Sequence, residues 1–268
     1  MQKLNPCSKS SMKRSNPNRS AFWLIFTLLL LVFNGCASLS LSPAPRLDPE
    51  ALTIVRHVQA INQEIRSCKG TGWITTGPAA QRKRYRLAYA AVPPDKIRIT
   101  LLASGFPVET ILADGQTVRF ISHTGDHSPY TFNSPDPSLE NAFSIPIRMS
   151  DVIRLLSGRV PVPEFKHLYL VTRSDNQGVV DLKKDFGRRK YRLTVDRLNH
   201  PAALSYFNDT GAQSYAVTFA PFASFDPVTI PADWSVTSDT GDYIRVEITS
   251  FTANIPIKDK VFRLTDQG

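Results

Sequence analysis

The apolar positions of the chain form three successive patterns, and the first is a short continuous run. Residues 21–33 are almost all apolar, and they follow a leader whose charged side chains are all basic. This run is shorter than the roughly 20 residues that a membrane-spanning helix needs, and small residues follow it. Residues 1–35 are therefore predicted to be a secretory signal peptide, so that the chain is exported.

The second pattern has the three- and four-residue spacing of a helix. Asp48 suits the N-cap, Pro49 the first helical position and Glu50 the first turn. The pattern predicts an amphipathic helix that runs from Asp48 until Gly70 ends it, with Cys68 as a small core residue at its end. The apolar residues of this stripe are Leu52, Val55, Val58, Ile61 and Ile65.

From Gly70 onward apolar and polar residues alternate, which is the period of β-strands. Gly, Pro, Asn and Asp separate the alternating runs, and Asp114-Gly115 is typical of a tight hairpin turn. A short helix is predicted at residues 151–156, between Ser150 and Gly158. The predicted strands are residues 70–76, 84–92, 96–102, 107–113, 117–122, 167–173, 178–184, 189–196, 202–208, 212–220, 234–237 and 242–251.

This order of elements predicts the fold class α+β. The amphipathic N-terminal helix must bury its apolar stripe, and a strongly curved sheet would give it an apolar face to lie on. We expect residues 48–268 to form one domain, in which a strongly curved antiparallel sheet makes an incomplete, half-open β-barrel. The N-terminal helix and a short lid helix complete it.

Charge and cysteine content narrow the possible partners. Five of the 32 Lys and Arg precede Cys36, whereas none of the 23 Asp and Glu do, so the chain from Cys36 onward has a net charge of only +4. Basic clusters at residues 82–86 and 188–192 are interleaved with Tyr, but export argues against nucleic acid as a partner. They are expected to be solvated strand ends or contacts to anionic head groups. Cys68 is the one thiol left once Cys36 is modified, so no internal disulfide is expected.

The sequence has no constellation typical of catalysis. Its five histidines lack metal-ligand spacing, since His123 and His127 straddle Gly125 in a predicted loop. There is no Gly-x-Ser-x-Gly elbow and no phosphate-binding loop. We therefore predict no enzyme activity, no metal and no cofactor.

The end of the signal peptide resembles the lipobox of bacterial lipoproteins. Gly35 and Cys36 match that pattern, whereas Phe33 stands where the family usually has Leu. The resemblance implies that Cys36 is acylated and becomes the mature N-terminus. Ala37 and Ser38 carry no acidic retention signal, so the resemblance places the chain at the periplasmic face of the outer membrane. The alternative is an ordinary signal peptide that is cleaved nearby, with Cys36 present by chance.

The Ser- and Pro-rich residues 36–47 are expected to be a flexible tether between this anchor and the domain. Residues 84–108 contain a strand, a Pro-Asp turn, an Arg-bearing strand and a Gly-containing loop, and residues 111–118 contain a strand that ends in Asp-Gly. Residues 153–161 contain a short helix followed by Leu-x-Gly-x-x-Pro. In this order they resemble the LolA/LolB-like lipoprotein carrier superfamily, over residues 48–208.

The resemblance implies an open half-barrel with helices as a lid and an apolar cavity for acyl chains. Phe106 lies in the loop that in LolB-like proteins contacts the membrane, although it could instead fold back into the core. Alternate strand positions define the expected cavity wall, which consists of Tyr85, Leu87, Tyr89, Ile97, Ile99 and Leu101. An interior packed solid by side chains would show the same alternation.

The resulting hypothesis is an anchored lipoprotein that accepts or transfers acylated lipoprotein or lipid cargo without covalent chemistry. A soluble periplasmic carrier protein is then a further expected partner. The rival hypothesis is a structural lipoprotein of an envelope assembly that binds no lipid. Cavity volume separates the two hypotheses, because a lumen too small for an acyl chain argues against a carrier.

Overall fold

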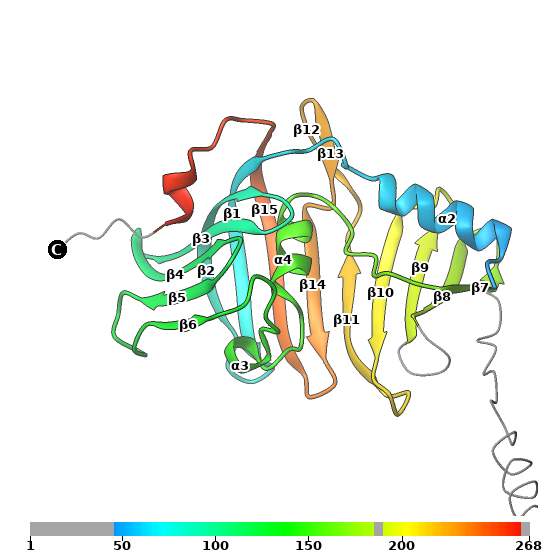
Figure 1. Cartoon of the computed structure of the whole chain (residues 1–268), viewed down its shortest axis with the longest axis horizontal. Coiled ribbons are helices and arrows are strands. Elements are labelled where there is room, and N and C mark those ends of the chain that lie inside the picture. Colours follow the sequence, from blue (N-terminus) through cyan, green and yellow to red (C-terminus); the bar gives the residue numbers. More distant parts are fainter. Residues whose placement is uncertain (1–45, 185–189, 264–268) are drawn as a thin grey trace, which may run out of the picture. The chain divides into compact units, whose positions relative to one another are not determined.

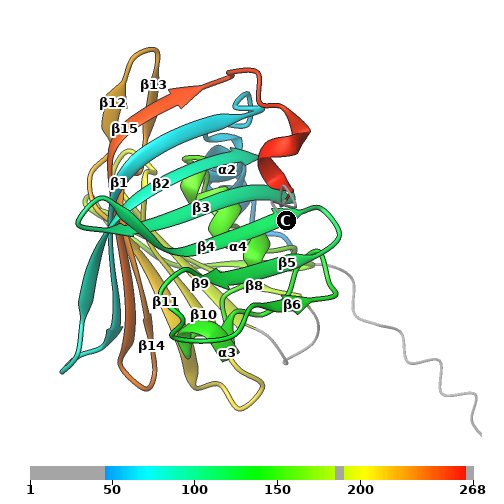
Figure 2. The ribbon, with the colours of Figure 1, turned by 90° about the vertical axis from the view of Figure 1, so that its left-hand side faces the viewer.

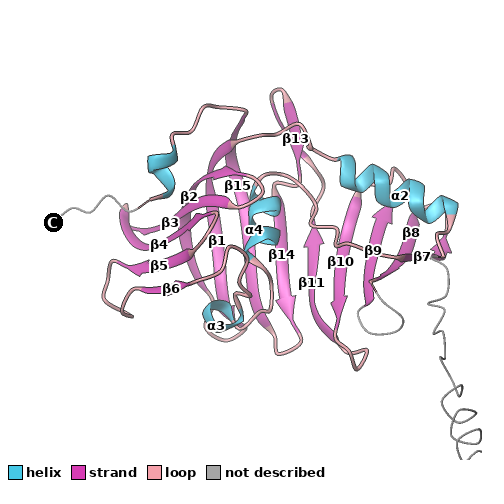
Figure 3. Ribbon diagram, viewed as in Figure 1, coloured by secondary structure: helices cyan, strands magenta, loops and turns pink. Residues whose placement is uncertain are grey.

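The computed structural model describes residues 46–184 and 190–263. The predicted signal peptide, Cys36 and most of the tether lie outside the described residues. The described chain is mostly β, with a 13-stranded antiparallel sheet and a few short helices (Figures 1 and 3). The strands of this sheet are β1 (Cys68–Pro78), β2 (Lys83–Val92), β3 (Lys96–Ala103), β4 (Phe106–Asp114), β5 (Val118–Ser122), β6 (Tyr130–Phe132), β7 (His167–Arg173), β8 (Gln177–Lys183), β9 (Lys190–Asp196), β10 (Pro201–Phe207), β11 (Gln213–Phe219), β14 (Asp233–Ser238) and β15 (Asp242–Ala253).

The sheet joins two meanders. Its strand order is β6-β5-β4-β3-β2-β1-β15-β14-β11-β10-β9-β8-β7, so β15 from the C-terminal part pairs with both β1 and β14 (Figure 2). Among the described strands β6 and β7 form the two ends, and the sheet is open. The predicted antiparallel sheet, N-terminal helix and short second helix are confirmed.

Five short elements are absent from the sequence-based prediction. They are β6, α3 (Glu140–Phe143), β12 (Ala223–Phe225), β13 (Val228–Ile230) and the 3-10 helix η1 (Asp259–Phe262). β12 and β13 form a separate two-stranded sheet. Each of these elements has only three or four residues, which is too few for a periodic pattern.

The strand register gathers the apolar residues on one face of the sheet. Ile99 lies opposite Tyr89 and Ile111, and Val217 lies opposite Leu204 and Val236. All of these side chains are buried. Because residues two apart in a strand share a face, this register makes an apolar surface that runs through both meanders.

Two helices cover this surface. α2 (Pro49–Ala60) packs its buried residues Ile54, Val55 and Val58 against apolar side chains of β7 to β10. α4 (Met149–Leu156) belongs to the larger core cluster, which also contains apolar side chains of β1 to β5, β11, β14 and β15.

α2 begins as predicted and ends early. The Asp48 carboxylate accepts hydrogen bonds from the backbone N–H groups of Glu50 and Ala51, both at 3.0 Å, as an N-cap does. The predicted continuation of the helix to Gly70 is wrong, because the helix ends at Ala60. Cys68 therefore begins β1 and does not end a helix, although it is buried as predicted.

Tertiary contacts explain the early end of α2. Asn62 has a positive φ of 55° and donates its side-chain N–H groups to the backbone oxygens of Gly158 at 2.7 Å and Thr229 at 3.0 Å. The Arg159 guanidinium donates to the backbone oxygens of Asn62 at 3.0 Å and Gln63 at 3.1 Å. The bonds from Arg159 satisfy backbone oxygens just past the end of α2, and the side-chain bonds of Asn62 hold that residue at its positive φ. The chain therefore leaves the helix and turns toward β1.

Candidate apolar binding site

A small, partly open hollow lies between α4 and the sheet, and we call it the apolar cavity. Its volume is about 40 Å³. Every described residue that lines it has a hydrophobic side chain, and Trp234 also carries an indole N–H. The lining residues are Ile74, Leu87, Ile99, Leu101, Ile111, Leu139, Phe143, Ile147, Met149, Val152, Leu156, Trp234, Val236, Ile244 and Val246.

The predicted cavity residues divide into two groups. Leu87, Ile99 and Leu101 line the apolar cavity, and Leu87 and Leu101 face each other across β2 and β3. Ile97 and Tyr89 are buried in the same core cluster and do not line the hollow. The sixth residue, Tyr85, is half-buried and packs against the cluster.

Sequence reasoning missed the residues that close the cavity. α4 and the segment before it contribute side chains such as Phe143, Met149 and Val152, while β14 and β15 contribute Trp234 and Val246. The alternation of Trp234 with Val236 predicted a strand, but it did not reveal which strand would lie beside it. The pairing of β15 with β1 brings these residues to the cavity.

Two buried polar atoms near this core lack a hydrogen-bond partner within the described chain. They are the Tyr89 hydroxyl and the Trp234 Nε1. Burial raises the pKa of Tyr89 well above its ordinary value. Gly70 leaves room for the Tyr89 ring, because a Cβ there would lie 2.5 Å from the Tyr89 hydroxyl oxygen and the ring would have to move.

Phe106 follows a two-residue hairpin turn between β3 and β4. Ser104 and Gly105 both have positive φ, at 50° and 86°, and Ala103 pairs with Phe106. The Phe106 side chain is 75% exposed, so it does not fold back into the core.

Most described members of the two basic clusters contact other side chains of the chain. Arg84 pairs with Glu247 at 3.0 Å, and its guanidinium lies 4.7 Å from the centre of the Trp73 ring. Lys190 and Arg192 both contact the Asp181 carboxylate at 2.8 Å. These pairs lower the pKa of Asp181 below its ordinary value against the opposing effect of burial.

The described residues 46–184 and 190–263 contain no group of three or more His, Cys, Asp or Glu side chains placed to hold a metal ion. His127 instead pairs with Glu109 at 3.0 Å, and His123 hydrogen-bonds to Thr110 at 2.9 Å. Burial raises the pKa of the Cys68 thiol to about 11, which suits a core residue and not a reactive thiolate. None of the described helices is both long and apolar enough to span a bilayer.

Comparison with known proteins gives structural matches only. No protein-family model matches the sequence, and no curated protein matches it. The structure is similar to a LolA superfamily protein, NE2245, from Nitrosomonas europaea, with a TM-score of 0.56, 15% identity and coverage of 80% of this chain and 97% of that one. It is also similar to a DUF1329 family protein from Desulfovibrio piger ATCC 29098, with a TM-score of 0.56, 7% identity and coverage of 80% and 94%.

Proposed function

Because this chain has the LolA-superfamily fold, as its sequence resemblance predicted, we propose that it is an outer-membrane lipoprotein that carries acylated cargo. On this proposal the acyl chain of a lipid or lipoprotein enters the apolar cavity under α4. The observation that carries the proposal is the lining of a hollow between helix and sheet by hydrophobic side chains. Such a lining can hold a hydrocarbon chain by burial alone, so the proposed role needs no catalysis.

The volume of the cavity means that cargo must displace α4. Ligand sites usually measure about 300–1,000 Å³, whereas this cavity holds about 40 Å³. The side chains Met149, Val152 and Leu156 meet the sheet through apolar contact. Because such contact is not directional, an acyl chain could replace these side chains at small net cost. On this proposal residues 139–156 act as the lid, and the sheet is the wall of an incomplete barrel.

The small volume of the apolar cavity is also compatible with the rival hypothesis. A structural lipoprotein of an envelope assembly would have a solidly packed interior, and the cavity in its present state is too small for an acyl chain. The two functions differ in one property, which is whether the lid opens for an apolar ligand.

The proposed location at the outer membrane rests on the tether, residues 36–47, which would join the anchor at Cys36 to the folded domain. Acylation of Cys36 would anchor the chain in the outer membrane. Leu47 pairs with Leu168 of β7, and the Asp48 N–H donates to the Leu168 oxygen at 3.3 Å, so the first described residues lie against that strand. Cargo would arrive from a soluble periplasmic carrier protein and leave to the membrane.

Tryptophan fluorescence can test the carrier function directly. Trp234 lines the apolar cavity and is 2% exposed, whereas Trp73 lies under Arg84 and Arg86 on the opposite sheet face. In a Trp73→Phe variant, titration with brominated palmitate should quench Trp234 with saturation. The matched Trp234→Phe variant keeps Trp73 and should show little quenching.

Absence of saturable Trp234 quenching would reject the carrier and favour the structural lipoprotein. Equal quenching of both tryptophans would indicate surface adsorption, which also counts against the proposal.

A further inference from the structure

A second hollow lies on the other side of α4, and we call it the polar groove. Its volume is about 580 Å³, which falls in the usual range for ligand sites. It shares no lining residue with the apolar cavity. Ser150, Asp151 and Arg154 of α4 form one wall, and Tyr206 of β10 and Tyr215 of β11 belong to the facing wall.

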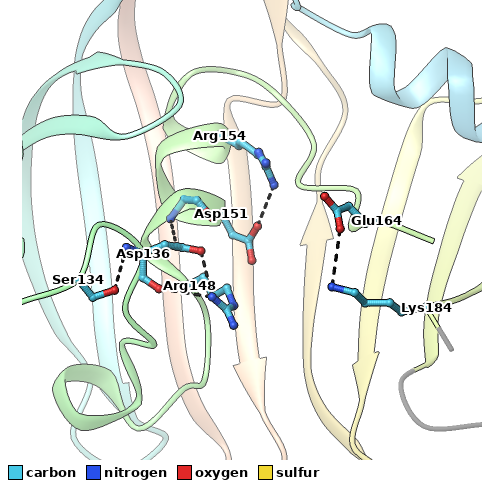
Figure 4. Close-up of polar contacts among 8 residues, drawn as sticks. Ser134, Asp136, Arg148, Asp151, Arg154, Glu164 and Lys184 are labelled. Carbon is cyan, nitrogen blue, oxygen red and sulfur yellow. Dashed lines mark hydrogen bonds and ion pairs between the residues drawn. The ribbon is translucent and has the colours of Figure 1, made fainter. Parts of the chain in front are cut away.

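The charges of the polar groove disfavour an anionic ligand. Of the described residues that line it, three carry a positive charge, and each already contacts a carboxylate. Figure 4 shows these pairs, which are Arg148 with Asp136 at 3.1 Å, Arg154 with Asp151 at 3.4 Å and Lys184 with Glu164 at 3.7 Å. An anion would have to compete with these carboxylates for the cations. The groove has a fourth carboxylate, Asp209, which is exposed in the turn between β10 and β11. Beside Asp151 a cation would meet the guanidinium groups of Arg148 and Arg154, so a neutral ligand fits this part of the groove best.

Asp151 gives the groove an under-used hydrogen-bond acceptor. Its residue is 8% exposed, and its contact with the Arg154 Nη1 at 3.4 Å is long for a hydrogen bond. A carboxylate can accept about four hydrogen bonds, so Asp151 has capacity for donors from a ligand. Burial raises its pKa to about 6, as expected for a carboxylate with few partners.

Aromatic rings form the apolar part of the groove. Tyr206 stacks on Tyr215 with ring centres 4.2 Å apart, and Tyr191 meets Tyr206 edge-on at 5.1 Å. The Tyr206 hydroxyl donates to the Pro161 backbone oxygen at 3.0 Å, which fixes the position of this ring. Flat rings beside carboxylate, hydroxyl and amide groups suit a ligand with apolar C–H faces and many hydroxyls.

An extended peptide fits this site less well. Peptides in extended form commonly bind by adding a strand to a free sheet edge. β10 pairs with β9 and β11, and β11 pairs with β10 and β14, so the strands of this wall have no free edge.

We propose that the polar groove binds a neutral oligosaccharide. Sugar rings lie against the half-buried rings of Tyr191 and Tyr206, while the buried Tyr215 supports Tyr206 from behind. Sugar hydroxyls donate hydrogen bonds to Asp151. The polar groove is separate from the proposed acyl-binding cavity. The proposal that it binds sugar therefore does not depend on the carrier function.

The test measures binding of two neutral trisaccharides, maltotriose and fully N-acetylated chitotriose, to the full chain in mild detergent. Isothermal titration gives affinity, and saturation-transfer NMR shows whether sugar C–H protons contact the protein. We expect saturable binding of at least one trisaccharide. Asp151→Asn should weaken it several-fold and Asp151→Ala about tenfold or more, because Asn retains one acceptor and Ala none.

Glu247→Gln is the matched control, since Glu247 pairs with Arg84 outside the groove and its removal should leave binding unchanged. Binding of neither trisaccharide, or equal binding by wild type and Asp151→Ala, would overturn the proposal. Binding of an extended Gly-Ser-Thr peptide in place of the sugars would assign the groove to a protein segment and would also overturn it.

Discussion

At the scale of single residues, two side chains are placed in positions that folding alone does not favour. Asp151 keeps a carboxylate at 8% exposure with one long ion pair, and Phe106 keeps an aromatic ring 75% exposed at a hairpin. A buried, poorly paired carboxylate costs stability, whereas an exposed ring contributes little to the core. Residues that bring no folding benefit are candidates for function, and each gives a prediction.

Asp151→Asn should stabilise the protein at neutral pH and not at acidic pH. The folded-state pKa of Asp151 is raised from 3.8 to about 6, chiefly by burial, with Asp136 raising it and Arg154 and Arg148 lowering it. The folded state therefore holds its proton more tightly than the unfolded state, and wild-type stability falls as pH rises from about 4 through 6. The gain of the variant should reach at most about 3 kcal/mol above pH 7.

Thermal melts of the wild type and the variant at pH 4 and pH 8 measure this effect. The difference in melting temperature should be small at pH 4 and positive at pH 8. A variant that is less stable than wild type at pH 8 would show that the Arg154 pair outweighs the cost of burial.

Phe106→Glu should leave stability within about 0.5 kcal/mol of wild type, because the side chain is exposed. If the hairpin contacts the membrane, the charge should slow transfer of a fluorescent fatty acid from the protein to liposomes. Leu198→Glu is the control, since Leu198 is 59% exposed at the β9–β10 turn. Equal slowing by both variants would argue against a specific role of Phe106.

At the scale of elements, partners distant in sequence decide where α2 ends. The stripe of apolar residues continues through Ile61 and Ile65, yet the helix ends at Ala60. Ile65 is still fully buried, in the core cluster under α4. The sequence pattern correctly predicted that Ile65 belongs to the apolar core, whereas the prediction that it is helical is wrong. Arg159 donates a hydrogen bond to the Asn62 backbone oxygen, and the Asn62 side chain donates one to the Gly158 oxygen, so both residues fix the turn after the helix.

Arg159→Ala should therefore destabilise the fold by about 1–3 kcal/mol, because it removes a charged donor from several backbone oxygens. Those oxygens belong to Asn62, Gln63 and Ile65. Arg66→Ala, an exposed change in the same stretch, should alter stability by less than about 0.5 kcal/mol. Urea unfolding of both variants makes the comparison, and similar midpoints would show that Arg159 does not hold this turn.

At the scale of the whole molecule, the proposed function combines an anchor, a tether and a carrier domain. Cys36→Ala should prevent acylation and release the protein from membranes into the soluble fraction, whereas Cys68→Ala should stay membrane-bound. Partitioning between detergent and aqueous phases measures both variants. Continued detergent partitioning of Cys36→Ala would contradict lipidation at this residue.

The sequence by itself determined the local elements. Alternating residues such as Ile97, Ile99 and Leu101 predicted strands close to the observed bounds, and the Asp48-Pro49 cap predicted the start of α2. These features depend on neighbours within a few residues, so local patterns suffice to predict them. The order of these elements also carried the LolA resemblance.

Only the tertiary structure decided how these elements meet. The pairing of β15 with β1 joins the two meanders and brings Trp234 and Val246 to the cavity. The packing of α4 fills most of that cavity and leaves Asp151 in the wall of the polar groove. These outcomes depend on contacts between residues far apart in the chain, and strand alternation alone is compatible with either a filled or an open interior.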